Sequence, residues 1–210
     1  MEFLTPQIKF PDVSQASPEG LLAIGGDLSP ERLLLAYKSG IFPWFDKTQP
    51  ILWWSPDPRF VLFPENLKIS KSMQGLIRKQ VFKVSFNTCF ERIINECAEI
   101  KREGQNGTWI TEEMKTSYIK LHKLGYATSV EVWKDNNIVG GLYGVDLRNG
   151  IFCGESMFSK VSNASKFGFI YFLRNTTFKL IDCQVYTDHL ASLGAEEIDR
   201  RVFLSYLNIS

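Results

Sequence analysis

The chain has 210 residues, of which 44% are hydrophobic and 22% are charged, and its formal net charge is +1. This length and hydrophobic content predict a globular protein with one large domain or two small ones. The near balance of 24 basic and 23 acidic residues excludes a protein that coats nucleic acid through general basicity. The four cysteines and two histidines lack metal-ligand spacing, and no signal peptide or membrane-spanning stretch stands out. We expect a soluble, cytoplasmic protein without a metal site.

The first 63 residues differ in composition from the rest of the chain. They contain most of the nine prolines and three of the five tryptophans. Ser29 is a typical helix N-cap, Pro30 follows at the first helical position, and Gly40 is expected to end that helix. Two short strands, "ILWWS" and "RFVLF", are predicted on either side of a Pro-Asp-Pro turn. We expect residues 1–63 to form a small lobe with aromatic surfaces and residues 64–210 to form a larger domain.

The larger domain begins with a strand and two helices. "VFKVSF" is a predicted strand. A capping box of Thr88 and Glu91 is expected to open a helix that runs to about Arg102. Thr111 is expected to begin a second helix, which ends at Gly125.

Strands and helices then alternate to the end of the predicted pattern. "YATSVEVW", "IVGGLYGV" and "GIFCGESMF" predict a three-stranded meander. A helix over residues 163–175, a strand over residues 180–185 and a short helix ending at Gly194 complete the order β-α-α-β-β-β-α-β-α. This order resembles the core of the GCN5-related N-acyltransferase fold. We therefore expect an α+β protein with a mixed sheet and flanking helices, preceded by the small N-terminal lobe.

The segment before the helix at 163–175 argues against coenzyme A as the acyl donor. Coenzyme A enzymes of this fold normally carry a Gln/Arg-x-x-Gly-x-Gly/Ala loop, whose backbone N–H groups and helix N-terminus hold the pyrophosphate. The corresponding segment reads "FSKVSNASKFG", in which Gly168 falls inside the predicted helix. We expect no cofactor, and a coenzyme A-dependent N-acetyltransferase stays as the alternative function.

Five ordered segments resemble the leucyl/phenylalanyl-tRNA–protein transferase family, and the resemblance runs from about residue 11 to residue 207. The segments are "GIFPWF", "ILWWSPDPRF", "GTWITEEM", "FCGESMFS" and "LIDCQVYTDHLASLGA". The family transfers an amino acid from aminoacyl-tRNA to the N-terminal Arg or Lys of a protein and thereby marks it for degradation. The resemblance implies an aminoacyltransferase of the N-degron pathway, with Leu-tRNA and Phe-tRNA as donors and Met as a further amino acid.

Two tryptophans on predicted loops match positions that the family uses around the terminal adenosine of the tRNA. These are Trp44 and Trp109. Proteins hold single-stranded 3′ ends by stacking the bases on aromatic rings, so the resemblance implies a donor-binding role for both. Composition alone favours core packing instead, because tryptophan is highly buried on average. Trp53 and Trp54 are neighbours on one strand and face opposite ways, so at least one of them is expected to be structural.

A leucyl or phenylalanyl side chain needs an apolar pocket with little polar lining. The resemblance implies that five apolar residues form it: Leu142, Met157, Phe169, Phe172 and Ile181. Phe169 and Phe172 lie three residues apart on one predicted helix and therefore share a face. Plain core packing is the alternative for each of the five.

Polar and basic residues complete the expected substrate site. The resemblance makes Glu155, which lies on an apolar strand, a contact that orients polar groups of the substrate or Gln184. A satisfied core carboxylate or a pair with a lysine is the alternative. A basic run could meet tRNA phosphates or form a solvated helix face, and it consists of Lys68, Lys71, Arg78 and Lys79.

Two polar residues on the predicted strand at 180–185 are the catalytic candidates. Alternation puts Asp182 and Gln184 on one face and Ile181, Cys183 and Val185 on the other. We expect Asp182 to orient Gln184, whose carbonyl accepts a hydrogen bond from the attacking amine. A structural hydrogen-bonding pair is the alternative, and the residues leave open whether the proton passes within the substrate.

Two further functions compete with acyl transfer from tRNA. A thiol enzyme could use Cys183 and His189, but their spacing places them at opposite ends of a strand–helix junction and no third partner is apparent. A non-catalytic tRNA-binding module would explain the stacking tryptophans. It gives no reason for an apolar amino-acid pocket beside Asp182 and Gln184.

Overall fold

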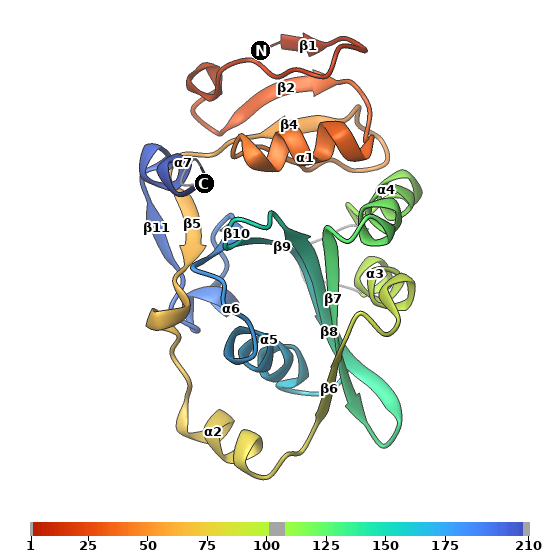
Figure 1. Ribbon diagram of the computed structural model, residues 1–210, viewed down its shortest axis with the longest axis vertical. Coiled ribbons are helices and arrows are strands. Elements are labelled where there is room, and N and C mark those ends of the chain that lie inside the picture. The colour runs from red at the N-terminus through yellow and green to blue at the C-terminus, as the bar shows by residue number, and fades with distance from the viewer. Residues whose placement is uncertain (1, 101–107, 208–210) are drawn as a thin grey trace.

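The computed structural model describes residues 2–100 and 108–207 (Figure 1). Its strands form a four-stranded sheet, in the order β1-β2-β4-β3, and a seven-stranded sheet, in the order β11-β5-β10-β9-β8-β7-β6. Helices pack beside both sheets, so the expected α+β class with a mixed sheet and flanking helices is confirmed. In the described ranges, no helix has the length and apolar character needed to cross a membrane.

The four-stranded sheet and one helix form the N-terminal part of the molecule, at the top of Figure 1. Their bounds are β1 (Glu2–Leu4), β2 (Leu21–Gly25), α1 (Pro30–Lys38), β3 (Phe42–Pro43) and β4 (Leu52–Trp54), with a 3₁₀ helix η1 (Val13–Gln15) between β1 and β2. Ser29 caps α1 by accepting a hydrogen bond from the backbone N–H of Arg32, and Gly40 after the helix has a φ of +74°, as its C-terminal role requires.

The larger sheet is built mostly from the second half of the chain. Its strands are β5 (Arg59–Leu62), β6 (Lys83–Phe86), β7 (Ala127–Lys134), β8 (Asn137–Asp146), β9 (Ile151–Ser159), β10 (Leu180–Gln184) and β11 (Glu196–Ile198). Its helices are η2 (Pro64–Asn66), α2 (Lys71–Arg78), α3 (Phe90–Glu99), α4 (Glu112–Lys123), α5 (Ala164–Arg174), α6 (Asp188–Ala191) and α7 (Arg200–Leu207). The predicted order of elements is confirmed from β6 to α6, whereas β11 and α7 were not predicted.

Strand β5 joins the N-terminal part of the chain to the larger sheet. It pairs antiparallel with both β10 and β11, although it precedes residue 64. Strands β9 and β10 run parallel, and the other neighbours in this sheet are antiparallel. The division into residues 1–63 and 64–210 stays a prediction, and the last strand of the first segment lies in the sheet of the second.

The capping box expected at the start of α3 was wrong. The helix begins at Phe90 after Cys89, which makes no capping hydrogen bond through its side chain. The Thr88 hydroxyl instead donates to the buried carboxylate of Glu131 on β7, at 2.8 Å. A tertiary contact has therefore replaced the local cap, and the expected end of this helix near Arg102 lies outside the described residues.

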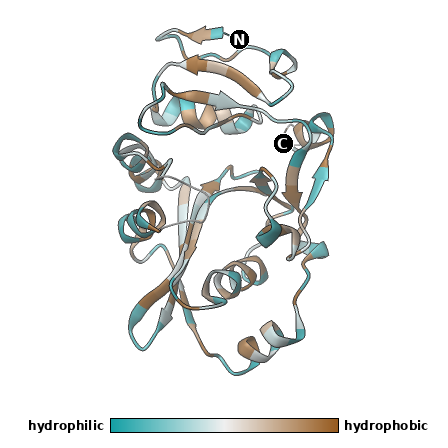
Figure 2. Cartoon of the chain, turned by 180° about the vertical axis from the view of Figure 1, so that it is seen from behind, coloured by the Kyte–Doolittle hydropathy of each residue, from teal (hydrophilic) through white to brown (hydrophobic). Residues whose placement is uncertain are grey.

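Two helical layers cover the larger sheet. Helices α3 and α4 pack on one face and α5 on the other (Figure 1). Figure 2 shows that α3 and α4 carry hydrophilic residues on their outer sides. Gly168 allows α5 to approach the sheet closely, because a Cβ at this position would lie 2.5 Å from a methyl carbon of Val132. This packing explains a glycine inside the helix without any phosphate contact.

Candidate active site

A cavity of about 290 Å³ lies between the segment that follows β3, the strands β8 to β10 and the helices α5 and α6. Eight of the ten predicted site residues line it: Trp44, Trp109, Leu142, Glu155, Met157, Phe169, Ile181 and Gln184. They come from distant parts of the sequence, so the fold brings the predicted donor-binding, apolar and polar residues to one place. Phe172 and Asp182 lie outside the cavity wall.

Two tryptophans, Trp44 and Trp109, line the cavity. Trp44 is 41% exposed, and its backbone carbonyl oxygen accepts a hydrogen bond from Nε1 of Trp54 at 2.7 Å. Trp109 is partly buried and lies just before the first turn of α4. Trp53 is fully buried, and its Nε1 donates to the carbonyl oxygen of Gly25. The expectation that one of the adjacent tryptophans is structural is therefore confirmed.

The apolar wall of the cavity is formed by strands and by one helix. Leu142, Met157 and Ile181 contribute from β8, β9 and β10, and Phe169 contributes from α5. The expected contribution of Phe172 to this wall was wrong. Phe172 is one turn further along α5 and packs behind Phe152, with 4.8 Å between the ring centroids, while Phe152 itself lines the cavity.

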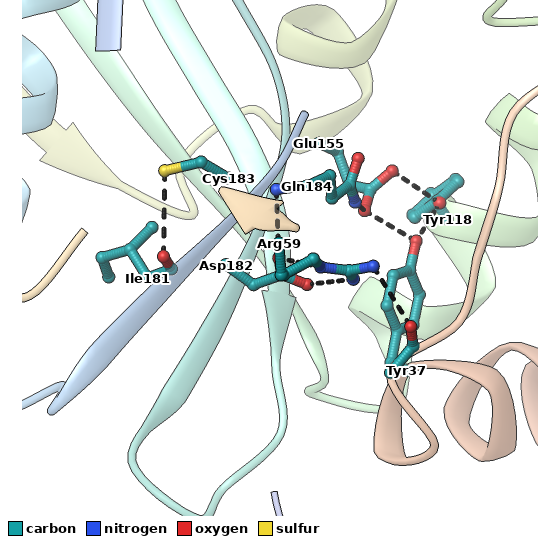
Figure 3. A network of polar contacts seen from close by, with 9 residues as sticks. Tyr37, Arg59, Tyr118, Glu155, Ile181, Asp182, Cys183 and Gln184 are labelled. Atoms are coloured by element: carbon teal, nitrogen blue, oxygen red, sulfur yellow. Dashed lines mark hydrogen bonds and ion pairs between the residues drawn. The ribbon is translucent and has the colours of Figure 1, made fainter. Parts of the chain in front are cut away.

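Glu155 is the buried acid of the site, and it is 9% exposed on β9 (Figure 3). Its Oε1 lies 2.7 Å from the hydroxyl of Tyr37 and accepts a hydrogen bond from Nε2 of Gln184 at 2.8 Å. Its Oε2 lies 2.8 Å from the hydroxyl of Tyr118. Burial raises the pKa of Glu155 to about 7, because the three hydrogen bonds offset the lost hydration only in part and the charge of Asp182 adds to the rise.

Asp182 is held by an arginine that the sequence analysis missed. Nε and Nη2 of Arg59 donate to the two carboxylate oxygens at 2.8 and 2.7 Å, and both side chains are 1% exposed. Nη1 of Arg59 donates to the carbonyl oxygen of Gly40, and its guanidinium lies 4.7 Å from the ring centroids of Phe42 and Phe203. A signal was available, since an arginine in the apolar run "RFVLF" needs a buried anion and "LIDCQV" contains one.

A bulge at the end of β10 separates the two catalytic candidates. The register against β5 shifts between Asp182 and Gln184, and Gln184 has a φ of +66°. The expectation that Asp182 and Gln184 share one face, opposite Ile181 and Cys183, was therefore wrong: Gln184 lines the cavity with Ile181 and Cys183, and Asp182 does not. Its Oδ1 accepts the backbone N–H of Gln184 at 3.0 Å, while the Gln184 side chain reaches Glu155 and the cavity (Figure 3). Asp182 contacts the backbone of Gln184 and not its amide group.

Tyr37 and Tyr118 are the other members of the site that sequence reasoning missed. Tyr37 comes from α1 and Tyr118 from α4, and their hydroxyls are hydrogen-bonded to each other as well as to Glu155. Both are fully buried, so they look like core residues in the sequence pattern. No local spacing connects residues that meet from three separate elements.

Comparison with known proteins gives the family. The family model described as "Leucyl/phenylalanyl-tRNA protein transferase" matches residues 61–208, and the model for its N-terminal domain matches residues 26–57. Leucyl/phenylalanyl-tRNA–protein transferase of Flavobacterium johnsoniae is 60% identical over 99% of this chain and 99% of its own, and that of Christiangramia forsetii is 60% identical over 99% and 100%. A solved GCN5-related N-acetyltransferase from Kribbella flavida matches 77% of this chain and 58% of its own, with 10% identity and a TM-score of 0.39. The nearly full-length sequence matches show that this chain belongs to the leucyl/phenylalanyl-tRNA–protein transferase family and is a transferase enzyme.

Proposed function

We propose that this protein transfers leucine, and also phenylalanine or methionine, from aminoacyl-tRNA to the N-terminal Arg or Lys of acceptor proteins, and thereby creates a degradation signal. The observation that carries the proposal is one cavity whose lining combines two tryptophans, an apolar wall and a glutamine that is hydrogen-bonded to Glu155. The acceptor class follows from the family to which the chain belongs. Aminoacyl-tRNA is a cytoplasmic substrate, so we place the reaction in the cytoplasm.

The tryptophans suit the 3′ end of the donor. Trp44 exposes an aromatic surface, and Trp109 lines the same cavity. Stacking of a base on an aromatic ring contributes about 1–3 kcal/mol. Adenine held by Trp44 and Trp109 would leave the aminoacyl ester directed into the cavity.

The apolar wall suits an aliphatic or aromatic side chain of moderate size. Met157 and Phe169 provide a flexible thioether and a flat ring, which adapt to related shapes. Such a pocket distinguishes ligands by only about 1–3 kcal/mol per methylene group. The cavity therefore supports a transferase that accepts more than one apolar amino acid.

Attack of the acceptor α-amine on the aminoacyl ester depends more on the alignment of these two groups than on a strong base. An α-amine has a pKa of about 7.7–8.0, so roughly one molecule in ten is neutral at pH 7 and deprotonation costs about 1 kcal/mol. Alignment of the amine with the ester can supply about 7–11 kcal/mol. Because Nε2 of Gln184 donates to Glu155, its carbonyl oxygen is directed away from that carboxyl group and can accept a hydrogen bond from the amine. The nitrogen forms a bond to the ester carbon, and the bond from that carbon to the 3′-oxygen breaks.

The competing functions find less support. Gly168, the glycine of the segment where a coenzyme A loop would lie, serves helix–sheet packing. The thiol of Cys183 has a pKa raised by burial and by the charge of Asp182, which disfavours the thiolate that a nucleophile needs. A non-catalytic tRNA-binding module needs no glutamine held in place by a buried acid.

Transfer of an amino acid from tRNA to a peptide tests the proposed function. The purified protein is mixed with Leu-tRNA and a peptide that begins with Arg, and the peptide mass is measured. We expect one added leucine, none with the same peptide acetylated at its N-terminus, and a rate lowered about 10²–10⁴-fold by Gln184→Ala with donor affinity little changed. No added mass with Leu-, Phe- or Met-tRNA would refute the proposed function, and a thermal shift with coenzyme A would favour the acetyltransferase.

A further inference from the structure

Three buried side chains from three elements form a closed ring of oxygen contacts beside the cavity (Figure 3). The Tyr37 hydroxyl contacts Oε1 of Glu155, the Tyr118 hydroxyl contacts Oε2, and the two hydroxyls contact each other. Tyr37 and Tyr118 are 1% and 0% exposed. Each of the three contacts needs one proton between its two oxygens.

The number of protons in the ring determines the protonation state of Glu155. Each tyrosine hydroxyl carries one proton and an ionised carboxylate carries none, so an ionised Glu155 would leave one contact as two facing lone pairs. A neutral carboxylic acid supplies the third proton. Oε2–H then donates to Tyr118, Tyr118 donates to Tyr37, and Tyr37 donates to Oε1, which also accepts Nε2 of Gln184 at 2.8 Å. Every group in the ring then donates once and accepts at least once.

The surroundings of the ring also favour the neutral acid. Groups with charge or a titratable proton that interact with the ring or with its neighbours come from β5, β8, β9 and β10: Arg59, Tyr143, Cys153 and Asp182. Arg59, the one cation among these groups, is engaged by Asp182 through both carboxylate oxygens. Burial and the charge of Asp182 raise the pKa of Glu155 to about 7, and burial raises the pKa of both tyrosines. The third proton is therefore present below neutrality and is the one lost as the pH rises.

We propose that the ring of Tyr37, Tyr118 and Glu155 holds Glu155 as a neutral acid and carries the proton from the attacking amine to the departing 3′-oxygen. This inference rests on the proposed function. As the nitrogen–carbon bond forms and the bond to the 3′-oxygen breaks, the carboxyl group gives its proton to that oxygen and takes one from the nitrogen. The ring returns to its starting state, and it neither gains nor loses a proton. Glu155 is among the residues that line the cavity, and in this proposal its carboxyl group contacts the reacting ester.

Infrared difference spectroscopy tests the state of the acid without any activity. The spectrum of wild type is compared with that of Glu155→Gln, one pH unit below and one above the pKa of about 7. We expect a protonated carboxyl band that is present at the lower pH, weak at the higher pH and absent from the variant. The control is Glu113→Gln, the same change at an exposed glutamate on α4, and it keeps the band. Folded wild type without the band at the lower pH would overturn the proposal.

Steady-state kinetics over a range of pH test the proton transfer. We expect kcat of wild type to fall above the pKa of Glu155, and Glu155→Gln to lose this falling limb and about 10²–10⁴-fold of kcat with donor KM little changed. Tyr118→Phe, which opens the ring but keeps the carboxyl group, is expected to shift the limb, whereas Tyr206→Phe on α7 is expected to leave it in place. An unchanged limb in folded Glu155→Gln and Tyr118→Phe would overturn the proton path. If wild type transfers nothing, the proposed function fails, and the infrared result still decides the state of Glu155.

Discussion

Replacing Asp182 by alanine leaves the guanidinium of Arg59 buried without its counter-charge. Both side chains are 1% exposed, and the pair is joined by two hydrogen bonds of 2.8 and 2.7 Å. Removal of one partner of a buried ion pair costs about 3–5 kcal/mol, against a total stability of about 5–15 kcal/mol for a typical protein. For a chain of this size the change corresponds to a fall in Tm of about 6–20 °C.

The double variant Arg59→Met/Asp182→Leu separates stability from catalysis. Replacing a buried ion pair by apolar residues of similar volume is often neutral or stabilising, so we expect most of the lost free energy of unfolding to return. We also expect Asp182→Ala to lower kcat, because the backbone N–H of Gln184 loses its acceptor on Asp182. The double variant still lacks that acceptor, so its kcat is expected to stay low. The Asp182→Asn variant keeps an oxygen acceptor for that N–H and is expected to lose less of kcat than Asp182→Ala.

Urea unfolding and steady-state kinetics on these variants provide the assay. The free energy of unfolding reports the ion pair, and kcat at saturating Leu-tRNA reports the position of Gln184. Wild-type stability in Asp182→Ala would refute the reasoning about the buried pair. Full recovery of kcat in the double variant would show that Asp182 serves only as the counter-charge of Arg59 and does not position Gln184.

Four further predictions follow from the site. Trp109→Ala is expected to raise the donor KM roughly 5- to 150-fold in a folded protein, since one stack of about 1–3 kcal/mol is lost, and an unchanged KM would support a core role. Met157→Ala is expected to weaken the preference for Leu-tRNA over Val-tRNA, because Met157 lines the cavity. Phe172 lies behind the cavity wall, so Phe172→Ala is expected to cost about 3–5 kcal/mol of stability and to leave the preference unchanged. Because the pKa of Glu155 is raised to about 7 in the folded state, the free energy of unfolding is expected to fall by roughly 3 kcal/mol as the pH rises from the unfolded pKa of about 4.3 to about 7. Urea unfolding of Glu155→Gln at the same pH values is expected to show no such fall. Alkylation at neutral pH is expected to leave Cys183 unmodified and the activity intact, whereas inactivation that follows Cys183 labelling would support the thiol enzyme.

Local patterns predicted most of the secondary structure. The order from β6 to α6 follows from strand and helix periodicity, and the Ser29 cap with Pro30 and Gly40 marks α1 correctly because those signals act within one turn. The capping-box prediction failed because a tertiary contact replaced the local one. The hydroxyl of Thr88 donates a hydrogen bond to Glu131, which lies 43 residues further along the chain, and a rule based on neighbouring residues does not predict that contact.

The site shows the same division between local and tertiary information. Family resemblance placed eight residues on the cavity wall, but strand alternation predicted the wrong orientation for Gln184, which lines the cavity together with Ile181 and Cys183. Alternation holds only for a regular strand, and the positive φ at Gln184 ends it there. The partners Arg59 and Tyr37 come from segments more than a hundred residues before β10, so their contacts depend on the sheet order and the packing of α1.

The central claim is that one cavity holds the donor adenosine, the aminoacyl side chain and the reacting ester beside Gln184. A crystal structure with leucyl-adenosine joined by a stable 3′-amide tests it most directly. We predict adenine against Trp44 and Trp109, the leucyl side chain against Met157 and Phe169, and the amide carbonyl carbon next to the side chain of Gln184. An analogue bound with its leucyl group outside this cavity would contradict the account.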